Sequence, residues 1–323
     1  MTKSPDTSPR DLGRGSRGFR GAWRDRLRPE RPKELLLIAA ASLAWGFCYP
    51  PFPIGPLVFA VLAPLFVSVA RLAPWQAFRY SFAAGILYNT AMYWWIYNVI
   101  KVGPALVIGS GLVVLILFLS LFNGLLGWMY RIASARPWAL AAYPFLWAGL
   151  EVVRTWGQMS FPWSHAGYAL GQYPSLIQAV SFLGIFGLSA AVVGANVLLA
   201  AAWRAGRGGA RLGLIATALA IPALLWVHGA WSLSRPDPDA GTLDIGLVQP
   251  SIPQTKKWDE NYFQEVMQKT WRTMEGGKDS SARPLAGADL IVLPETAVPD
   301  FLRSRGDVQS RLGSIARENG GDL

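Results

Sequence analysis

The chain begins with a polar arm, continues through a long apolar region and ends in short alternating runs. A helix needs about 20 apolar residues to cross the hydrocarbon core of a bilayer, and seven apolar runs predict seven such helices. They are Lys33 to Tyr49, Ile54 to Ala70, Ala77 to Tyr97, Pro104 to Tyr130, Trp138 to Trp156, Leu176 to Trp203 and Leu212 to Trp231. The first two are short and share a proline-rich break at 49–53, so they fit equally well a hairpin that dips into the bilayer.

A different pattern follows the linker at 232–241. Leu243 to Gln249 and Asp289 to Leu293 predict buried strands, while Asp259 to about Glu275 and Val308 to Glu318 predict amphipathic helices. Strands that alternate with helices are typical of the start of an α/β sheet. We therefore expect four regions, which are a basic arm at 1–32, a transmembrane domain at 33–231, the linker at 232–241 and an α/β domain at 242–323.

The distribution of charge supports this division. Only nine basic residues and one acidic residue lie between Leu35 and Trp231, which is too few to solvate a globular surface and excludes a soluble or disordered segment. The net charge of +10 arises largely in the arm, so it does not indicate a nucleic-acid partner. A single cysteine, Cys48, excludes an intramolecular disulfide and a multi-cysteine metal site.

Basic residues also predict the orientation of the chain. With the amino end in the cytoplasm, the cytoplasmic segments collect 17 Lys and Arg residues, and the opposite loops hold only Lys101 and Arg154. Basic loops are retained on the cytoplasmic side. We therefore expect everything after Trp231 to lie outside the cytoplasm.

Three asparagines and three glycines in the apolar region suggest helix contacts rather than chemistry. Asn89, Asn123 and Asn196 lie inside apolar runs, where an unpaired amide is costly, so they are expected to hydrogen-bond between helices. Gly184, together with Gly187 and Gly194, is expected to allow close helix packing.

The residues near the ends of the predicted spans leave structural and functional interpretations open. Glu151 and Arg154 are three residues apart on a predicted helix and can form an ion pair near the membrane surface or contact a phospholipid headgroup. Trp163, Tyr168 and Trp231 are either interfacial anchors or the lining of a lipid entry. His165 and His228 lack a ligand-spaced partner, so we expect no metal site.

Glu295 is the strongest candidate for chemistry. It follows the second predicted strand directly, and reactive groups in α/β sheets cluster beyond the carboxyl ends of strands. From its position alone, a structural ion pair with Arg303 or Arg305 would be the simpler interpretation.

Three separated segments carry the motifs of a known family. They are 293–300 (LPETAVPD), 246–254 (GLVQPSIPQ) with the Lys-Trp-Asp run at 257–259, and the loop Phe161-Pro162-Trp163 with Gly167-Tyr168 beyond it. Attached to seven predicted spans, these segments resemble the apolipoprotein N-acyltransferases of the nitrilase superfamily. The resemblance reverses the interpretation of Glu295 in favour of catalysis.

The resemblance implies both a fold and a reaction. The fold would be a polytopic α-helical membrane domain followed by the N-terminal part of an α/β nitrilase-like (CN hydrolase, α-β-β-α sandwich) domain. The reaction would move a fatty acyl chain from a phospholipid to the N-terminal diacylglyceryl-cysteine of a lipoprotein, the final step of lipoprotein maturation, without a cofactor. The protein would lie in the bacterial inner membrane, with its nitrilase-like domain in the periplasm.

The resemblance also implies a Glu-Lys-Cys triad in which the cysteine forms a thioacyl intermediate, the glutamate accepts the proton and the lysine stabilises the oxyanion. Only Glu295 can be placed, because the family's lysine and cysteine lie well downstream of the glutamate. Lys278 precedes the motif, and Cys48 is most simply a small buried hydrophobe. We therefore expect a truncated sequence that is inactive alone. The competing interpretations are a membrane-tethered nitrilase-like amidase or hydrolase and, with little support, a transporter or channel.

Overall fold

The computed structural model describes residues 32–102, 104–235, 241–257, 259–275, 285 and 287–319. The chain divides into two compact units. We call residues 32–100 and 105–235 the helical unit and residues 241–319 the tail unit. Residues 1–31 of the predicted basic arm lie outside the described residues, and so do residues 236–240 of the predicted linker.

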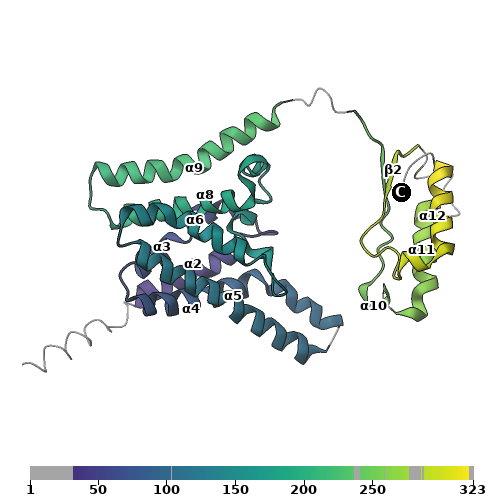
Figure 1. The fold of residues 1–323 in the computed structure, drawn as a ribbon, viewed down its shortest axis with the longest axis horizontal. Coiled ribbons are helices and arrows are strands. Elements are labelled where there is room, and N and C mark those ends of the chain that lie inside the picture. The colour runs from purple at the N-terminus through teal and green to yellow at the C-terminus, as the bar shows by residue number, and fades with distance from the viewer. Residues whose placement is uncertain are drawn as a thin grey trace, which may run out of the picture. The chain divides into compact units, whose positions relative to one another are not determined.

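The helical unit contains helix at each of the seven predicted spans (Figure 1). Its elements are α2 (Pro32–Gly46), η1 (Gly55–Phe59), α3 (Ala63–Val69), α4 (Pro74–Met92), η2 (Trp94–Val102), α5 (Ala105–Ala133), α6 (Pro137–Val153), η3 (Pro162–Ser164), η4 (Ala166–Leu170), α7 (Pro174–Ile177), α8 (Val180–Arg204) and α9 (Gly209–Leu233).

Among the described residues, three of these helices are long and apolar enough to cross a membrane, namely α5, α8 and α9. The others are shorter or, in α4, less apolar. The second predicted span is not one continuous α-helix. It consists of η1 and the seven-residue α3, which form a short apolar stretch over Gly55–Val69, and the alternative of a hairpin stays a prediction. Pro56 and Pro64 each lie in the first turn of their own piece, where the missing N–H is tolerated. In one continuous helix, Pro64 would lie in the interior, where a proline breaks the helix.

Helix α8 is interrupted near its start. Gly184 has a φ of +64° and a ψ of 175°, an extended left-handed conformation that a residue with a Cβ rarely adopts. No atom outside its immediate neighbours lies within 4 Å of the place where its Cβ would be. The expectation that Gly184 permits close packing is therefore wrong, and its role is to break the helix.

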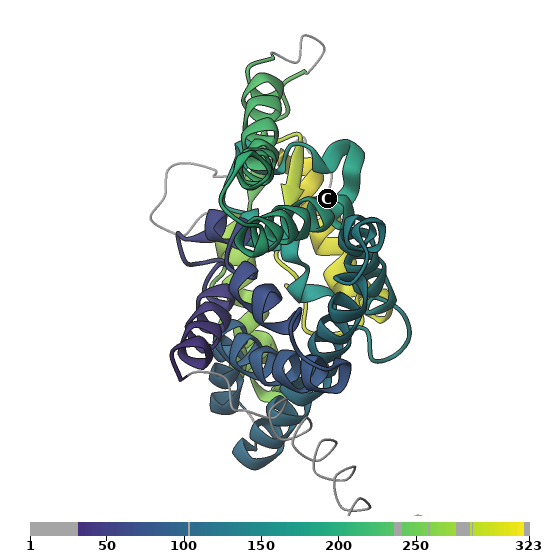
Figure 2. The ribbon, with the colours of Figure 1, turned by 90° about the vertical axis from the view of Figure 1, so that its left-hand side faces the viewer.

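Polar side chains join the helices of the unit as predicted. Helices α4 and α5 lie side by side in both views (Figures 1 and 2), and the Asn89 amide on α4 donates to the Ser120 Oγ and the Asn123 Oδ1 on α5, at 3.1 and 3.2 Å. Asn196 on α8 accepts from the backbone N–H groups of Leu62 and Ala63 at 2.8 and 3.1 Å. These contacts confirm the expected interhelical role of the buried amides.

The tail unit begins an α/β arrangement. Its elements are β1 (Ile245–Leu247), α10 (Gln254–Lys257), η5 (Glu260–Tyr262), α11 (Phe263–Glu275), β2 (Leu290–Val292), η6 (Leu302–Ser304) and α12 (Gly306–Asn319). The two strands are parallel, with Ile245 opposite Leu290. Met267 and Met274 on α11 and Leu312 on α12 share one core with strand residue Ile291. The order strand-helix-strand-helix is therefore confirmed. The prediction that the first strand is buried is wrong, because Ile245 and Leu247 are 51% and 76% exposed in a strand of three residues. The complete nitrilase-like sandwich stays a prediction.

Candidate functional site

Glu295 lies in a turn beyond the carboxyl end of β2, where the sequence predicted it. The turn is closed by the Ala297 N–H, which donates to the Pro294 carbonyl at 3.1 Å. The next residue, Thr296, has a φ of +55° and donates its hydroxyl to the Glu295 carbonyl at 2.7 Å. The Glu295 side chain is exposed, so the strand end presents a carboxylate to solvent.

A lysine from another element holds the same turn. The Nζ of Lys257, the last residue of α10, donates to the backbone carbonyl of Glu295 at 2.8 Å. The interaction fixes the backbone and leaves the carboxylate free. Within the described part of the chain, the Glu295 carboxylate forms no ion pair, whereas Arg305 pairs with Asp300 and Asp307 at 3.0 Å. The ion pair that we considered between Glu295 and Arg303 or Arg305 is therefore absent.

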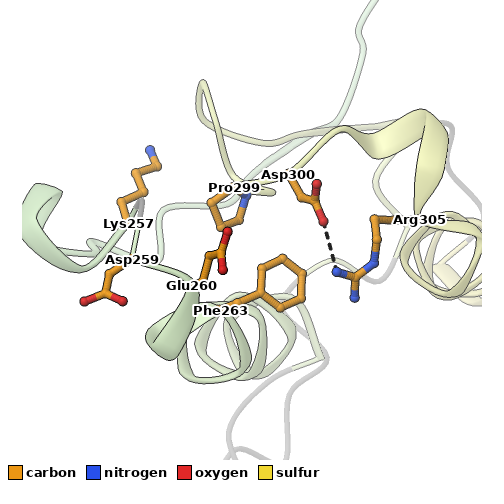
Figure 3. A pocket seen from close by; sticks show the side chains of 7 residues that line it. All are labelled: Lys257, Asp259, Glu260, Phe263, Pro299, Asp300 and Arg305. Atoms are coloured by element: carbon orange, nitrogen blue, oxygen red, sulfur yellow. Dashed lines mark hydrogen bonds and ion pairs between the residues drawn. The ribbon is translucent and has the colours of Figure 1, made fainter.

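A pocket of about 330 Å³ lies beside this turn. Glu260 on η5 and Phe263 at the start of α11 line it, and Pro299 and Asp300 line it from the segment that follows Glu295 (Figure 3). Lys257 also lines the pocket, so one side chain contacts both the pocket and the Glu295 turn. Glu295 itself is not among the lining residues.

The charges at the far side of the pocket are mutually satisfied. The hydrogen bond from Arg305 lowers the pKa of Asp307 to about 2, and the two carboxylates raise the pKa of Arg305. Arg305 also lies over the ring of Phe263 at 4.3 Å. Arg305 and Phe263 therefore form one wall of the pocket, and Asp307, which is not a lining residue, pairs with Arg305.

A second set of candidate residues meets in the helical unit around the loop between α6 and α7. Glu151, near the end of α6, is 2% exposed and accepts from the Trp147 indole N–H and from the Ala166 backbone N–H, both at 2.9 Å. The His165 Nδ1 lies 3.4 Å from the Oε2 of Glu151, within ion-pair distance when the imidazole is protonated. Because the Glu151 carboxylate is buried, it does not contact a substrate in solvent. Glu151 therefore holds the loop against the helix.

Arg154 fastens the loop at another point. It donates to the Ser164 hydroxyl, and the Ser164 carbonyl accepts from the Tyr49 hydroxyl at 3.4 Å. The expected Glu151–Arg154 ion pair is wrong: in the described structure the Glu151 carboxylate meets Trp147 and the loop instead. Arg154 comes directly after the last residue of α6, and its side chain contacts Ser164 in the loop.

The fastened loop carries exposed aromatic side chains. Trp163 is 51% exposed and stacks on Trp95, with ring centroids 5.2 Å apart, and Phe161 packs against Trp163 at 5.4 Å. We call Trp95, Phe161 and Trp163 the aromatic shelf. Tyr168, further along the loop, is 41% exposed and packs against His165.

Trp231 is separate from the loop in sequence, near the end of α9. The Arg235 guanidinium lies 3.5 Å from the centre of its ring, and the His228 ring lies 6.1 Å away. A charged partner on an exposed indole is typical of a residue at the headgroup layer.

Comparison with known proteins shows which family the chain resembles. The family described as "Apolipoprotein N-acyltransferase N-terminal domain" matches residues 41–198, which include the loop that carries the aromatic shelf. The chain is 30% identical to the apolipoprotein N-acyltransferase of Geobacter metallireducens, over 90% of this chain and 56% of that protein. It is 32% identical to those of Brucella melitensis and Caulobacter vibrioides, over 82% and 86% of this chain and 47% and 52% of those proteins. Over most of its length the chain is therefore similar to apolipoprotein N-acyltransferases. It spans about half the length of the curated relatives that it matches.

Cys48, the single cysteine of the chain, lies where it cannot act as a nucleophile. Cys48 is fully buried in the helical unit, and its thiol donates to the Ala44 carbonyl at 3.3 Å, as a helical side chain often does. Lys278 lies outside the described residues. In the described part of the chain, no three His, Cys, Asp or Glu side chains come together to hold a metal ion.

Two contacts at the candidate sites have no signal in the sequence. His165 contacts Glu151, 14 positions away across a loop. Lys257 donates to the Glu295 turn, 38 positions away. Both separations are far longer than the spacing of neighbours on one helix, so only the folded chain brings the partners together.

Proposed function

We propose that the complete gene product transfers a fatty acyl chain from a membrane phospholipid to the α-amino group of the N-terminal diacylglyceryl-cysteine of a lipoprotein. One observation carries the proposal: a chain that matches the acyltransferase family over 41–198 also presents an exposed, unpaired carboxylate, Glu295, beyond the end of a parallel strand. The activity is proposed for the complete product because this chain spans about half of its relatives.

In the proposed chemistry Glu295 moves the proton. It accepts the proton of a cysteine thiol, and the thiolate attacks the ester carbonyl of the phospholipid. The carbon–sulfur bond forms as the ester carbon–oxygen bond breaks, and Glu295 returns the proton to the departing oxygen of the lysophospholipid. The lipoprotein amine then attacks the thioester, which forms the amide and releases the thiol. Burial and the bond to Ala44 make Cys48 unsuitable, so the thiol and the oxyanion-stabilising lysine are expected elsewhere in the complete product.

The geometry around Glu295 favours this role over a structural one. Hydrogen bonds from Lys257 and Thr296 end on its backbone carbonyl, so the turn is held while the carboxylate stays available. A general base is effective when its position is fixed and its oxygens are free to accept a proton.

We propose that the aromatic shelf, Trp95, Phe161 and Trp163, binds the phospholipid, with Tyr168 and Trp231 as further contacts. Indole and phenol rings with one apolar side and one polar edge suit the layer where acyl chains meet headgroups. In this account Glu151 and Arg154 do not touch the lipid. They hold the loop, as their burial and loop contacts favour.

We further propose the orientation that the basic residues predict: seven spans in the bacterial inner membrane, with the amino end in the cytoplasm and the tail unit outside. A soluble-substrate amidase would need one anchor, and a helical unit with three membrane-length helices favours lipid substrates. An alkaline phosphatase fused at Gly241 should be active in cells, and activity of a cytoplasmic reporter at the same position would contradict the orientation.

The test of the chemistry compares two matched substitutions in the complete gene product. Glu295→Gln removes the proton acceptor, and Glu318→Gln changes an exposed carboxylate on α12 in the same unit. Each purified variant is mixed with phospholipid and a diacylglyceryl-cysteine peptide, and the acylated peptide is followed by mass spectrometry. We expect Glu295→Gln to lower the rate of peptide acylation at least a hundredfold, since general-base catalysis contributes a factor of about 10²–10⁴. Glu318→Gln should leave that rate unchanged. Wild-type product formation by Glu295→Gln would refute the proposal.

A further inference from the structure

A groove between α3, α8 and α9 has the features of a lipid-binding site that the acyl-transfer chemistry does not use. It has a volume of about 240 Å³. Small or apolar side chains line most of its length. The lining comprises Ala60, Ala63, Pro64, Leu199, Ala202, Trp203, Arg211 and Ile215. The groove therefore has an apolar floor and a single cation.

The floor of the groove is held in place by a buried amide. Asn196 on α8 is fully buried, and both polar atoms of its side chain bind the backbone of the η1–α3 segment. Its Oδ1 accepts from the Leu62 and Ala63 N–H groups, and its Nδ2 donates to the Val58 carbonyl at 2.7 Å. Because these bonds fix α3 against α8, the groove is part of the packed structure.

Among the described residues of the helical unit, the cation of the groove has no acidic partner. The described helical unit contains two acidic residues, Glu34 and Glu151. Glu34 accepts from the Ser68 hydroxyl at 3.0 Å, and Glu151 is used by the loop. Neither forms an ion pair with Arg211, which is exposed at the start of α9. A guanidinium beside an apolar channel and an exposed indole complements a phosphate that carries an acyl chain.

The groove is remote from the aromatic shelf along α8. The loop is tied to Ser189, whose hydroxyl accepts from the Gly167 N–H at 3.0 Å, and the groove is lined by Ala202 on the same helix. Thirteen residues of helix at about 1.5 Å each separate them by roughly 20 Å, more than half of a hydrocarbon core. The groove and the loop therefore face different leaflets when the unit spans a bilayer.

We propose that this groove binds an anionic glycerophospholipid of the leaflet opposite the aromatic shelf, with the phosphate on Arg211 and an acyl chain along Ala60, Ala63 and Ala202. The inference does not depend on acyltransferase activity. It requires only that the helical unit lies in a membrane.

The test uses the 323-residue chain in detergent micelles, with phosphatidylglycerol added and bound lipid counted by native mass spectrometry. Arg211→Gln removes the phosphate ligand, and Arg207→Gln is a matched control in the same basic segment outside the groove. Ala60→Phe fills the apolar channel, and Ile215→Trp is a second filling variant. Thermal unfolding checks that each variant is folded.

We expect Arg211→Gln to weaken phosphatidylglycerol binding about tenfold or more, the effect of losing one charge-assisted hydrogen bond. A filling variant that keeps the wild-type unfolding midpoint should weaken binding at least fivefold, and Arg207→Gln should leave it within twofold. Glycerol phosphate, which lacks acyl chains, and diacylglycerol, which lacks phosphate, should each bind at least tenfold more weakly. The proposal would be overturned if the two arginine variants weakened binding equally, or if the folded filling variants bound phosphatidylglycerol as the wild type does. It would also be overturned if glycerol phosphate or diacylglycerol bound as tightly as phosphatidylglycerol.

Discussion

The clearest consequence of the loop geometry is the effect of removing the Glu151 carboxylate. In Glu151→Ala the Trp147 indole N–H and the Ala166 backbone N–H lose their acceptor inside a buried cluster. An unsatisfied buried donor costs about 1–3 kcal/mol. Two of them give about 2–6 kcal/mol of local destabilisation, and we take about 3 kcal/mol as the working value because the loop can relax. Glu151→Gln keeps an oxygen for both donors and should cost about 1 kcal/mol.

The cost should appear as opening of the loop and not as global unfolding. An increase of about 3 kcal/mol raises the opening equilibrium roughly a hundredfold, since each 1.4 kcal/mol is about tenfold. Hydrogen exchange of the chain in micelles, read by mass spectrometry on peptides that cover 161–170, measures this directly. Exchange in those peptides should accelerate about a hundredfold in Glu151→Ala and roughly fivefold in Glu151→Gln.

A matched substitution separates the loop effect from a general loss of stability. Glu34→Gln changes the other acidic residue of the helical unit, which accepts a hydrogen bond from Ser68 on α3. It should leave exchange at 161–170 unchanged. If Glu151→Ala also leaves that exchange unchanged, the carboxylate does not hold the loop and the reasoning from its contacts is refuted.

Three further substitutions test separate parts of the fold. Asn196→Ala, which leaves the Leu62 and Ala63 N–H groups without their acceptor, should destabilise the helical unit by about 2–4 kcal/mol, and a thermal midpoint in micelles close to the wild-type value would contradict this. Gly184→Ala should cost about 1–3 kcal/mol because φ is +64° there, whereas an unchanged midpoint would mean that α8 can straighten. Because Arg305 lowers the Asp307 pKa to about 2 from 3.8, their pairing stabilises the tail unit above about pH 4 and is lost as the pH falls through about 2. Arg305→Gln should therefore lower the denaturant midpoint of the tail unit at pH 7 and lower it less at pH 2, and an equal difference at both pH values would contradict the assignment.

Periodicity and proline positions predicted most of the architecture. Long apolar runs became α5, α8 and α9, and alternating runs became a parallel strand pair with helices. The error in the second span and at Gly184 has one cause. Hydropathy reports how apolar a segment is and does not report a backbone break inside it, which depends on φ and on where a proline falls in a turn.

The candidate site was only partly accessible to sequence reasoning. Glu295 could be placed because a strand end and a motif coincide. The Trp147 partner of Glu151 has helical spacing, whereas its partner in the loop could not be predicted. Helical spacing pointed to Arg154, three residues away, but the carboxylate binds the Ala166 N–H, which only the folded loop supplies. Contacts between a helix and a returning loop follow no sequence period, so the structure was needed to find them.

In the proposed function, Glu295 performs the proton transfer and the aromatic shelf serves only lipid binding. Single-turnover formation of the acyl-enzyme by the complete gene product separates the two roles. With saturating phospholipid, we predict that Glu295→Gln slows acyl-enzyme formation at least a hundredfold, whereas Trp163→Ala raises the phospholipid concentration required and leaves the saturated rate within threefold. Acyl-enzyme formation by Glu295→Gln at the wild-type rate would contradict the account.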